Sequence, residues 1–197
     1  MNIEALNQIL QNNLGNKVTP ELLVGILTAV QSADYAPINI EDIPSEVYGE
    51  FTIHCARLRT ILDEIVPLHQ RHWEETEKYR HGIPLNPNYE YMMQCEDQGR
   101  FLVFTVRHGD LLVGNCMMYM TKSTHTQEWI AEEDTIFILS EYRKGRLGLR
   151  FIKYVEDVLR NMGITEIRVT VKTVNRVGDL LQAVGYQHTA NQLTKIL

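Results

Sequence analysis

The residues best suited to chemistry lie in one stretch, which runs from Glu133 to Arg150. Its first half is an apolar strand pattern, its middle is a turn that contains Gly145 and Gly148, and its second half is a helix pattern. A strand that enters a helix through such a turn leaves backbone N–H groups unpaired at the helix start. Together with the helix dipole, these groups attract an anion, typically a phosphate. The stretch therefore predicts an anion-binding site.

Two common nucleotide-binding loops do not fit this turn. A Walker A loop ends in Gly-Lys followed by Ser or Thr, whereas Gly148 is followed by Leu149 and Arg150. The dinucleotide fingerprint GxGxxG is also missing, because Gly145 and Gly148 are separated by two other residues. What remains is a strand, the sequence Tyr-Arg-Lys-Gly-Arg-Leu-Gly, and a helix.

The charge of the chain is unevenly distributed. The net charge is −6, and residues 1–47 supply most of it, with six acidic residues against Lys17 alone. Residues 141–172 instead hold eight Lys or Arg residues and four acidic ones. Nucleic-acid-binding domains usually have a basic balance overall. A local positive excess on an acidic protein therefore indicates a small anionic ligand and no nucleic-acid partner.

Length and composition indicate one domain of ordinary size with an appendage. The 197 residues are 44% hydrophobic, no apolar run approaches 18 residues, and the N-terminus lacks the order of a secretory signal, so we expect no membrane segment. Cys55, Cys95 and Cys116 lie far apart and predict reduced thiols in a cytoplasmic protein. His69 and His72 lie three residues apart, but no second cluster completes a metal site, so we expect no metal.

The apolar patterns predict strands in a meander, followed by alternating helices and strands. This order favours a mixed α/β (α+β) sheet with helices on both faces. A proline at position 67 should kink or break the first helix of the sheet domain. A strand is predicted at 51–55, where a helix is the alternative. Further strands are predicted at 101–107, 111–120, within 127–139, 166–172 and 192–197. Helices are predicted at 56–79, 88–98, 146–161 and 175–184.

The N-terminal region is predicted to be a separate unit. Residues 2–14 place apolar side chains on one helical face, and Thr19 followed by a proline begins a second helix, which together predict a helical hairpin. Residues 33–47, with prolines and acidic residues, are predicted to be a linker. The prediction thus divides the chain into an extension with its linker, 1–47, and a domain, 48–197. The apolar faces of the hairpin pack either on that domain or on a second copy of the chain, which gives a possible homodimer.

The turn and its flanks carry a family resemblance. Arg143 lies five residues before Gly148, and Glu-Tyr precedes the arginine. This resembles the coenzyme A loop of the GNAT superfamily of N-acetyltransferases, including phage-encoded or bacterial members, whose pattern is Arg or Gln, two residues, Gly, one residue, and Gly or Ala. Arg146 stands where the family usually has its middle glycine. The resemblance covers roughly residues 50–197 and leaves the N-terminal region outside.

The resemblance implies a GNAT-like fold with a mixed, mainly antiparallel sheet, and it assigns residues to acetyl-CoA. The backbone at the end of the strand should bind the pantetheine arm in the manner of an added strand. The amides of the turn should bind the pyrophosphate, with arginines neutralising the phosphates. Asn175 is added because the segment from Asn175 to Tyr186 resembles the family's closing Asn…Gly-Phe segment. The residues assigned in this way are Phe137, Ile138, Leu139, Arg143, Lys144, Gly145, Arg146, Leu147, Gly148, Leu149, Arg150 and Asn175.

Acetyl transfer needs a base. A lysine-type amine with a pKa of about 10.4 is almost wholly protonated at pH 7, so a base must take its proton. Members of the resembled family often place a Glu on the strand before the loop for this purpose. Asp134, with Glu132 and Glu133 adjacent, lies at about that place and is the predicted catalytic base. The strand amide near Ile138 should stabilise the developing oxyanion.

The departing thiolate needs an acid. The usual tyrosine of the resembled family falls on Leu181, which cannot donate a proton. Tyr186, Tyr154 or a water remain as substitutes. The resemblance implies an acetyl-CoA-dependent N-acetyltransferase that acts by direct attack in a ternary complex on an amine of a small molecule or protein. The alternative is a catalytically weak or inactive protein of the same fold that still binds coenzyme A.

Overall fold

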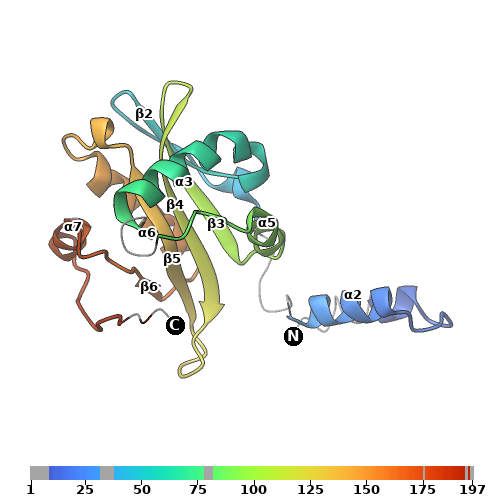
Figure 1. Ribbon diagram of the computed structural model, residues 1–197. Helices are drawn as coiled ribbons and strands as arrows, with labels where there is room; N and C mark the ends of the chain where they lie inside the picture. The colour runs from blue at the N-terminus through green and yellow to red at the C-terminus, as the bar shows by residue number, and fades with distance from the viewer. Residues whose placement is uncertain (1–8, 32–37, 78–81, 175, 194, 196–197) are drawn as a thin grey trace.

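Six strands form one sheet in the order β1-β2-β3-β4-β5-β6 within the part of the chain that the computed structural model describes (Figure 1). That part comprises residues 9–31, 38–77, 82–174, 176–193 and 195. Neighbouring strands are antiparallel except β5 and β6, which are parallel. The mixed, mainly antiparallel sheet predicted from the sequence is therefore confirmed. The strands are β1 (Glu46–Tyr48), β2 (Phe51–Ala56), β3 (Phe101–His108), β4 (Leu111–Lys122), β5 (Trp129–Ile138) and β6 (Glu166–Arg168).

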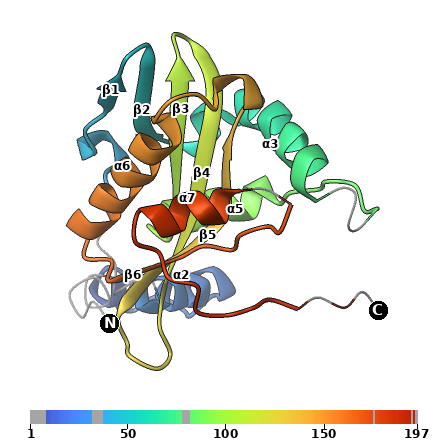
Figure 2. The ribbon, with the colours of Figure 1, turned by 90° about the vertical axis from the view of Figure 1, so that its left-hand side faces the viewer.

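Helices cover both faces of this sheet, as predicted. Figures 1 and 2 show α3 and α5 over one face and α6 over the other. The apolar residues of α6 recur at helical spacing, which buries Leu147, Phe151 and Leu159 on the side facing the sheet. The helices are α2 (Pro20–Gln31), α3 (Leu62–Thr76), α5 (Tyr89–Asp97), α6 (Leu147–Asn161) and α7 (Val177–Ala183), with short 3-10 helices at Ile40–Asp42, Leu58–Thr60 and Ser140–Tyr142.

The core is centred on β3 and β4. Residues 101–106 and 112–118 are all buried, because these strands have neighbours on both edges and helices over both faces. Gly114 of β4 allows a close approach to β5, since a Cβ atom there would lie 2.9 Å from the carbonyl oxygen of Phe137. The end of β5 is thereby held tightly against the core.

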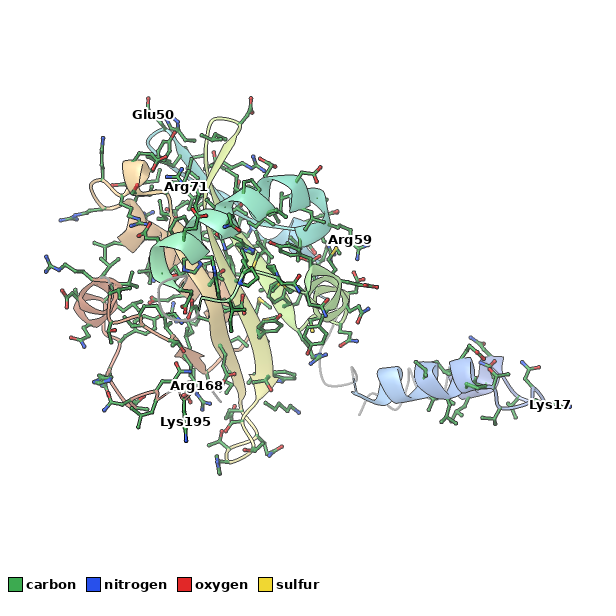
Figure 3. All side chains as sticks on the ribbon, in the orientation of Figure 1. Lys17, Glu50, Arg59, Arg71, Arg168 and Lys195 are labelled. Carbon is green, nitrogen blue, oxygen red and sulfur yellow. The ribbon has the colours of Figure 1, made fainter. Side chains whose placement is uncertain are left out.

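β6 accompanies β5 over a short distance only. Ile130 pairs with Glu166 and Glu132 with Arg168, where β6 ends. Arg168, labelled in Figure 3, makes ion pairs with Glu132 (3.2 Å) and Glu166 (2.6 Å) at this end of the pairing. β5 continues to Ile138 with β4 on its other edge. The edge of β5 over residues 133–138 is therefore not paired with β6.

Three sequence predictions differ from the structure. Glu46 and Val47, assigned to the linker, form the edge strand β1 together with Tyr48, and Ile40 before them is buried in the core, so packing with the sheet begins ahead of residue 48. A three-residue strand is too short to show an alternating pattern. Pro67 lies inside α3, which continues on both sides of it. The last strand, predicted at 192–197, is absent from the described residues after α7, a polar stretch without regular alternation.

The N-terminal region is only partly described. α2 corresponds to the second helix of the predicted hairpin, whereas the first helix, 2–14, lies mostly outside the described residues. α2 stands apart from the sheet in Figure 1, and Leu23 and Val24 on it are half exposed or more. The homodimer stays a prediction. Among the described helices, none combines the length and apolar character needed to cross a membrane.

Candidate active site

Two cavities lie along the unpaired part of β5, and they share part of their wall. The residues common to both are His72, Ile136 and Val177. The first cavity, of about 400 Å³, is otherwise lined by Glu75, Thr76, Phe137, Ile138, Arg143, Lys144, Gly145, Gly148, Leu149, Phe151, Ile152, Arg176 and Leu180. The second, of about 580 Å³, is otherwise lined by His69, Trp73, Glu77, Ile83, Pro84, Leu85, Asn86, Pro87, Met92, Glu133, Asp134, Thr135, Thr170, Val171 and Lys172.

The first cavity contains the predicted anion-binding turn. Gly145 has a φ of +62°, in the left-handed region that favours glycine. Arg146 stands just before the first turn of α6, and its side chain makes no capping hydrogen bond. The first N–H groups of α6 therefore lack a side-chain cap, and Gly148 and Leu149 bring this positive end of the helix dipole to the cavity wall. Such an arrangement suits a phosphate group.

Arg143 links the turn to α3 and to β5. Its Nε donates to the carbonyl oxygen of Ile138 (2.6 Å), and its two terminal nitrogens pair with Glu75 of α3 (2.5 and 2.8 Å). The guanidinium also lies over the ring of Phe137, 5.0 Å from its centre. Arg143 thus fixes the wall of the first cavity while it supplies positive charge there.

Several residues assigned to acetyl-CoA do not line this cavity. The guanidinium of Arg150 pairs with Glu46 (2.5 Å) and lies over the ring of Tyr48, so the structure carries it toward β1 instead. Asn175 lies outside the described residues. The described residues that the cavity wall does not include are Leu139, Arg146, Leu147 and Arg150.

A β-bulge brings two consecutive carboxylates to the second cavity. Met117 pairs with Thr135 and Met118 with Glu133, so Asp134 is the extra residue of the bulge. A bulge interrupts the alternation of side chains along a strand and re-aims them. Glu133 and Asp134 therefore line the same cavity. The Asp134 carboxylate accepts no hydrogen bond from the described part of the chain and is exposed.

The two carboxyl groups differ in their surroundings. Glu133 accepts a hydrogen bond from the backbone N–H of Thr170 (3.2 Å), and burial raises its pKa to about 7, with a further contribution from Asp134. Asp134 keeps solvent access, but the protein atoms that surround its carboxyl group in the cavity displace part of its water and raise its pKa, while Lys172 acts in the opposite direction. Lys172 in turn pairs with Glu77 at the end of α3 (2.5 Å). The cavity thus holds carboxyl groups whose protonation is adjusted toward neutral pH, a common feature of proton-transfer sites.

His72 lies where the two cavities meet. Its ring is 5.0 Å from that of Phe137 and tilted by 36°. Burial lowers the pKa of His72, so the imidazole is neutral at neutral pH. His69, one helical turn earlier, is more deeply buried, and its Nδ1 is hydrogen-bonded to the hydroxyl of Tyr89 (2.9 Å). Burial lowers the pKa of His69 to about 4, so it too is neutral.

The tyrosines considered from the sequence as the general acid do not line either cavity. Leu181, at the position of the resembled family's usual tyrosine, is buried. The hydroxyl of Tyr154 donates to the carbonyl oxygen of Pro44 (2.8 Å), and the pKa of Tyr186 is raised by burial and by the nearby carboxylate of Glu156. No tyrosine of the described chain lines either cavity.

Sequence reasoning missed part of this site. It considered His72 as a metal ligand and gave it no catalytic role, and no group of three or more metal-binding side chains occurs among the described residues. It also did not identify Lys172 or the cavity-facing position of Glu133. The bulge that brings Glu133 to the second cavity leaves no mark in the sequence, whereas the spacing of His69 and His72 does place both on one face of a helix.

Comparison with solved structures finds the same fold in acetyltransferases. An aminoglycoside acetyltransferase from an uncultured soil metagenomic sample, solved with sisomicin, is 14% identical with a TM-score of 0.62, and the match covers 77% of this chain and 99% of that one. The ribosomal-protein-alanine N-acetyltransferase of Brucella melitensis biovar Abortus 2308 is 16% identical with a TM-score of 0.55, covering 75% and 97%. A protein of Clostridium acetobutylicum described as a predicted acetyltransferase, solved with acetyl-CoA, is 10% identical with a TM-score of 0.58, covering 74% and 96%.

The sequence itself was compared in two further ways. It has no match among the curated proteins. Residues 60–185 match the model of the Acetyltransferase (GNAT) family. This segment contains β3 to β6, the glycine-containing turn, and the residues His72, Ile136 and Val177 that the two cavities share. Because this match spans more than half of the sequence, the chain belongs to the GNAT family of N-acetyltransferases.

Proposed function

We propose that this chain transfers the acetyl group of acetyl-CoA to an amine by direct attack within a ternary complex, with Asp134 as the catalytic base. The observation that carries the proposal is the pair of cavities that meet at the end of β5. One has the features of a phosphate site and the other contains carboxylates. Two substrates held in neighbouring cavities would have their reacting atoms close to the shared wall, which favours direct transfer.

The first cavity suits coenzyme A. Its pyrophosphate would bind to the N–H groups at the start of α6, with Arg143 and Lys144 supplying positive charge. The pantetheine arm would lie along the edge of β5 over residues 133–138, which β6 leaves unpaired, and would bond to the backbone as an added strand does. A backbone amide near Ile138 would then stabilise the oxyanion.

The second cavity suits a cationic amine. Glu77, Glu133 and Asp134 line it, and Lys172 is the only Lys or Arg among its described wall residues. This charge balance attracts an ammonium group. Asp134 would take the proton from the ammonium, because its carboxylate is exposed, whereas Glu133 is held by Thr170.

The acceptor is an amine of a small molecule or of a protein. The structural relatives include an aminoglycoside acetyltransferase, named for a small molecule, and a ribosomal-protein-alanine N-acetyltransferase, named for a protein. One observation favours a second function, that of a catalytically weak coenzyme A-binding protein. It is the lack of a tyrosine at either cavity within the described chain.

A thermal-shift titration with acetyl-CoA tests the claim that both functions share. A ligand at 100 times its dissociation constant adds about 2.7 kcal/mol to the free energy of unfolding. We expect a clear rise in Tm with acetyl-CoA. An unchanged Tm at millimolar acetyl-CoA would rule out both functions.

Thiol release from acetyl-CoA across a panel of amines separates the two functions. The wild-type chain should release thiol with at least one amine, and Asp134→Asn should lose about 100-fold or more in kcat, the usual contribution of a general base. Asp110→Asn, in the turn between β3 and β4, is the matched control and should behave as wild type. Equal rates for wild type and Asp134→Asn would show that Asp134 is not the base. A Tm rise without turnover on any amine would favour the binding protein.

A further inference from the structure

Asp134 first takes the proton of the ammonium group; we propose that His72 then carries the second amine proton, which is lost after the attack, to the departing thiolate of coenzyme A. This inference rests on the proposed function. The amine nitrogen and the thioester sulfur would approach the shared wall from opposite sides, one from each cavity. A residue that serves both atoms must therefore be accessible from both cavities.

Position alone selects His72 among the described residues. The wall that the cavities share consists of His72, Ile136 and Val177. An aliphatic side chain cannot accept or donate a proton, whereas an imidazole has two nitrogens, one that accepts and one that donates in the neutral form. His72 is thus the one proton carrier in the shared wall of the described site.

The surroundings of His72 hold its ring in place. The ring packs against Phe137, whose backbone belongs to the strand edge proposed for the pantetheine arm. The carbonyl oxygen of His72 accepts a hydrogen bond from the hydroxyl of Thr76 (2.9 Å), one helical turn later. The imidazole is therefore packed against β5 on one side, and the backbone that carries it is fixed within α3.

Charged groups of both signs face the imidazole. Burial is the main influence on its pKa and lowers it; Glu77 and Glu75 oppose this effect, whereas Lys172 and Arg143 add to it. The neutral His69 lies one helical turn away, and the Glu133 and Asp134 carboxyls line the adjoining cavity. A neutral imidazole can accept a proton but has none to give up at its accepting nitrogen. His72 must therefore take the proton from the amine before it gives one to the thiolate.

The proposed step is balanced in atoms and electrons. The neutral amine attacks the thioester carbon, a C–N bond forms, and the carbonyl π electrons move to the oxygen. The intermediate then carries a positive nitrogen and a negative oxygen. His72 takes one N–H proton. The oxygen lone pair re-forms the C=O bond while the C–S bond breaks, with its electrons going to sulfur. The imidazolium gives its proton to the thiolate, which leaves the amide, the thiol of coenzyme A and a neutral His72.

His69 is not an equivalent candidate, although it lines the second cavity. His69 is only 5% exposed, and its Nδ1 is hydrogen-bonded to the hydroxyl of Tyr89. It does not line the first cavity, from which the thiolate would depart. Proton transfer to sulfur therefore falls to His72.

Chemical rescue tests this role. His72→Ala is compared with wild type and with His125→Ala, a control in the exposed loop between β4 and β5. We measure thiol release with an amine that wild type accepts, and the acetyl-CoA-induced Tm rise. We expect His72→Ala to keep the Tm rise and to lose about 100-fold or more in kcat. Added imidazole should restore part of that rate, and methylimidazoles should restore it in the order of their pKa values. His125→Ala should match wild type with no response to imidazole.

The outcomes separate this proposal from the proposed function. If wild type releases thiol and His72→Ala does so within about threefold, below the usual contribution of a general acid or base, His72 is not the proton carrier and the transferase function stands. A large loss that no imidazole restores, in both His72→Ala and the better-packing His72→Gln, assigns His72 a structural role and overturns the proposal. If wild type binds acetyl-CoA but transfers to no amine, the proposed function fails, and the proton-carrier role of His72 fails with it.

Discussion

Glu133 should make the folded chain less stable as the pH rises, and Glu133→Gln should remove this effect. In the folded protein, burial raises the pKa of Glu133 from 4.5 to about 7. Between these values the folded state keeps a proton that the unfolded state has lost, so stability falls as the pH increases from 4.5 through 7. Gln carries no charge, and its side-chain oxygen still accepts the hydrogen bond from the backbone N–H of Thr170. The variant should therefore gain stability over wild type at high pH only.

The size of the effect follows from the pKa shift. A rise of the Glu133 pKa from 4.5 to about 7 corresponds to about 3 kcal/mol, and the negative charge of Asp134 contributes to it. We therefore expect Glu133→Gln to exceed wild type by up to about 3 kcal/mol at pH 8 and by little at pH 5. For comparison, single substitutions more often lower stability, by about 1 kcal/mol. A rise that depends on pH is thus a distinctive result.

Urea unfolding at pH 5 and pH 8 measures this difference. Both proteins should show the same dependence of unfolding free energy on urea, so that the midpoint alone reports stability. Glu132→Gln is the matched control, because Glu132 is the exposed neighbour and its ion pair with Arg168 is worth about 1 kcal/mol at most. If Glu133→Gln differs from wild type by the same amount at both pH values, or is less stable at pH 8, the reasoning about this carboxyl is wrong.

Two further predictions concern the turn and its arginines. Gly145→Ala should lower the free energy of unfolding by about 1–2 kcal/mol in urea titrations, because the φ of +62° is unfavourable for a residue with a Cβ atom, and its acetyl-CoA-induced Tm rise should shrink as the turn is displaced. Arg150→Ala should keep the full acetyl-CoA-induced Tm rise, since this guanidinium pairs with Glu46 away from the first cavity; loss of most of that rise would mean that Arg150 reaches a phosphate.

The fold was largely predictable because its longest elements have clear periodicity. β3, β4 and α6 were all predicted within a few residues of their ends, and the glycine-containing turn after β5 was recognised by its residues. β1 escaped prediction because three residues cannot display a period of two. It is held by pairing with β2, a contact that depends on tertiary structure and not on its own sequence.

The part of the site that is formed by backbone groups was predictable from the sequence. The part that depends on how side chains lie in space was less so. The phosphate-type turn depends on a strand, a glycine and a helix start, all of which are visible in the sequence. The roles of Arg143 and Arg150 depend on which acidic residue lies near each of them in space, and the sequence cannot provide this. Likewise, alternation along a strand would send Glu133 and Asp134 to opposite faces, and only the bulge opposite Met117 and Met118 brings them to one cavity.

One topological feature explains why both cavities occur together. β6 pairs with β5 as far as Glu132 and ends at Arg168, and the chain continues through Thr170 and Lys172, outside any strand, to α7. Beyond that point β5 keeps a strand neighbour on one edge only. The first cavity occupies the side toward α6 and α7, and the second the side toward Thr170 and Lys172. A longer β6 would cover the edge of β5 and bury Glu133 without access to a substrate. The short parallel pairing is therefore as necessary to the proposed chemistry as the residues that line the cavities.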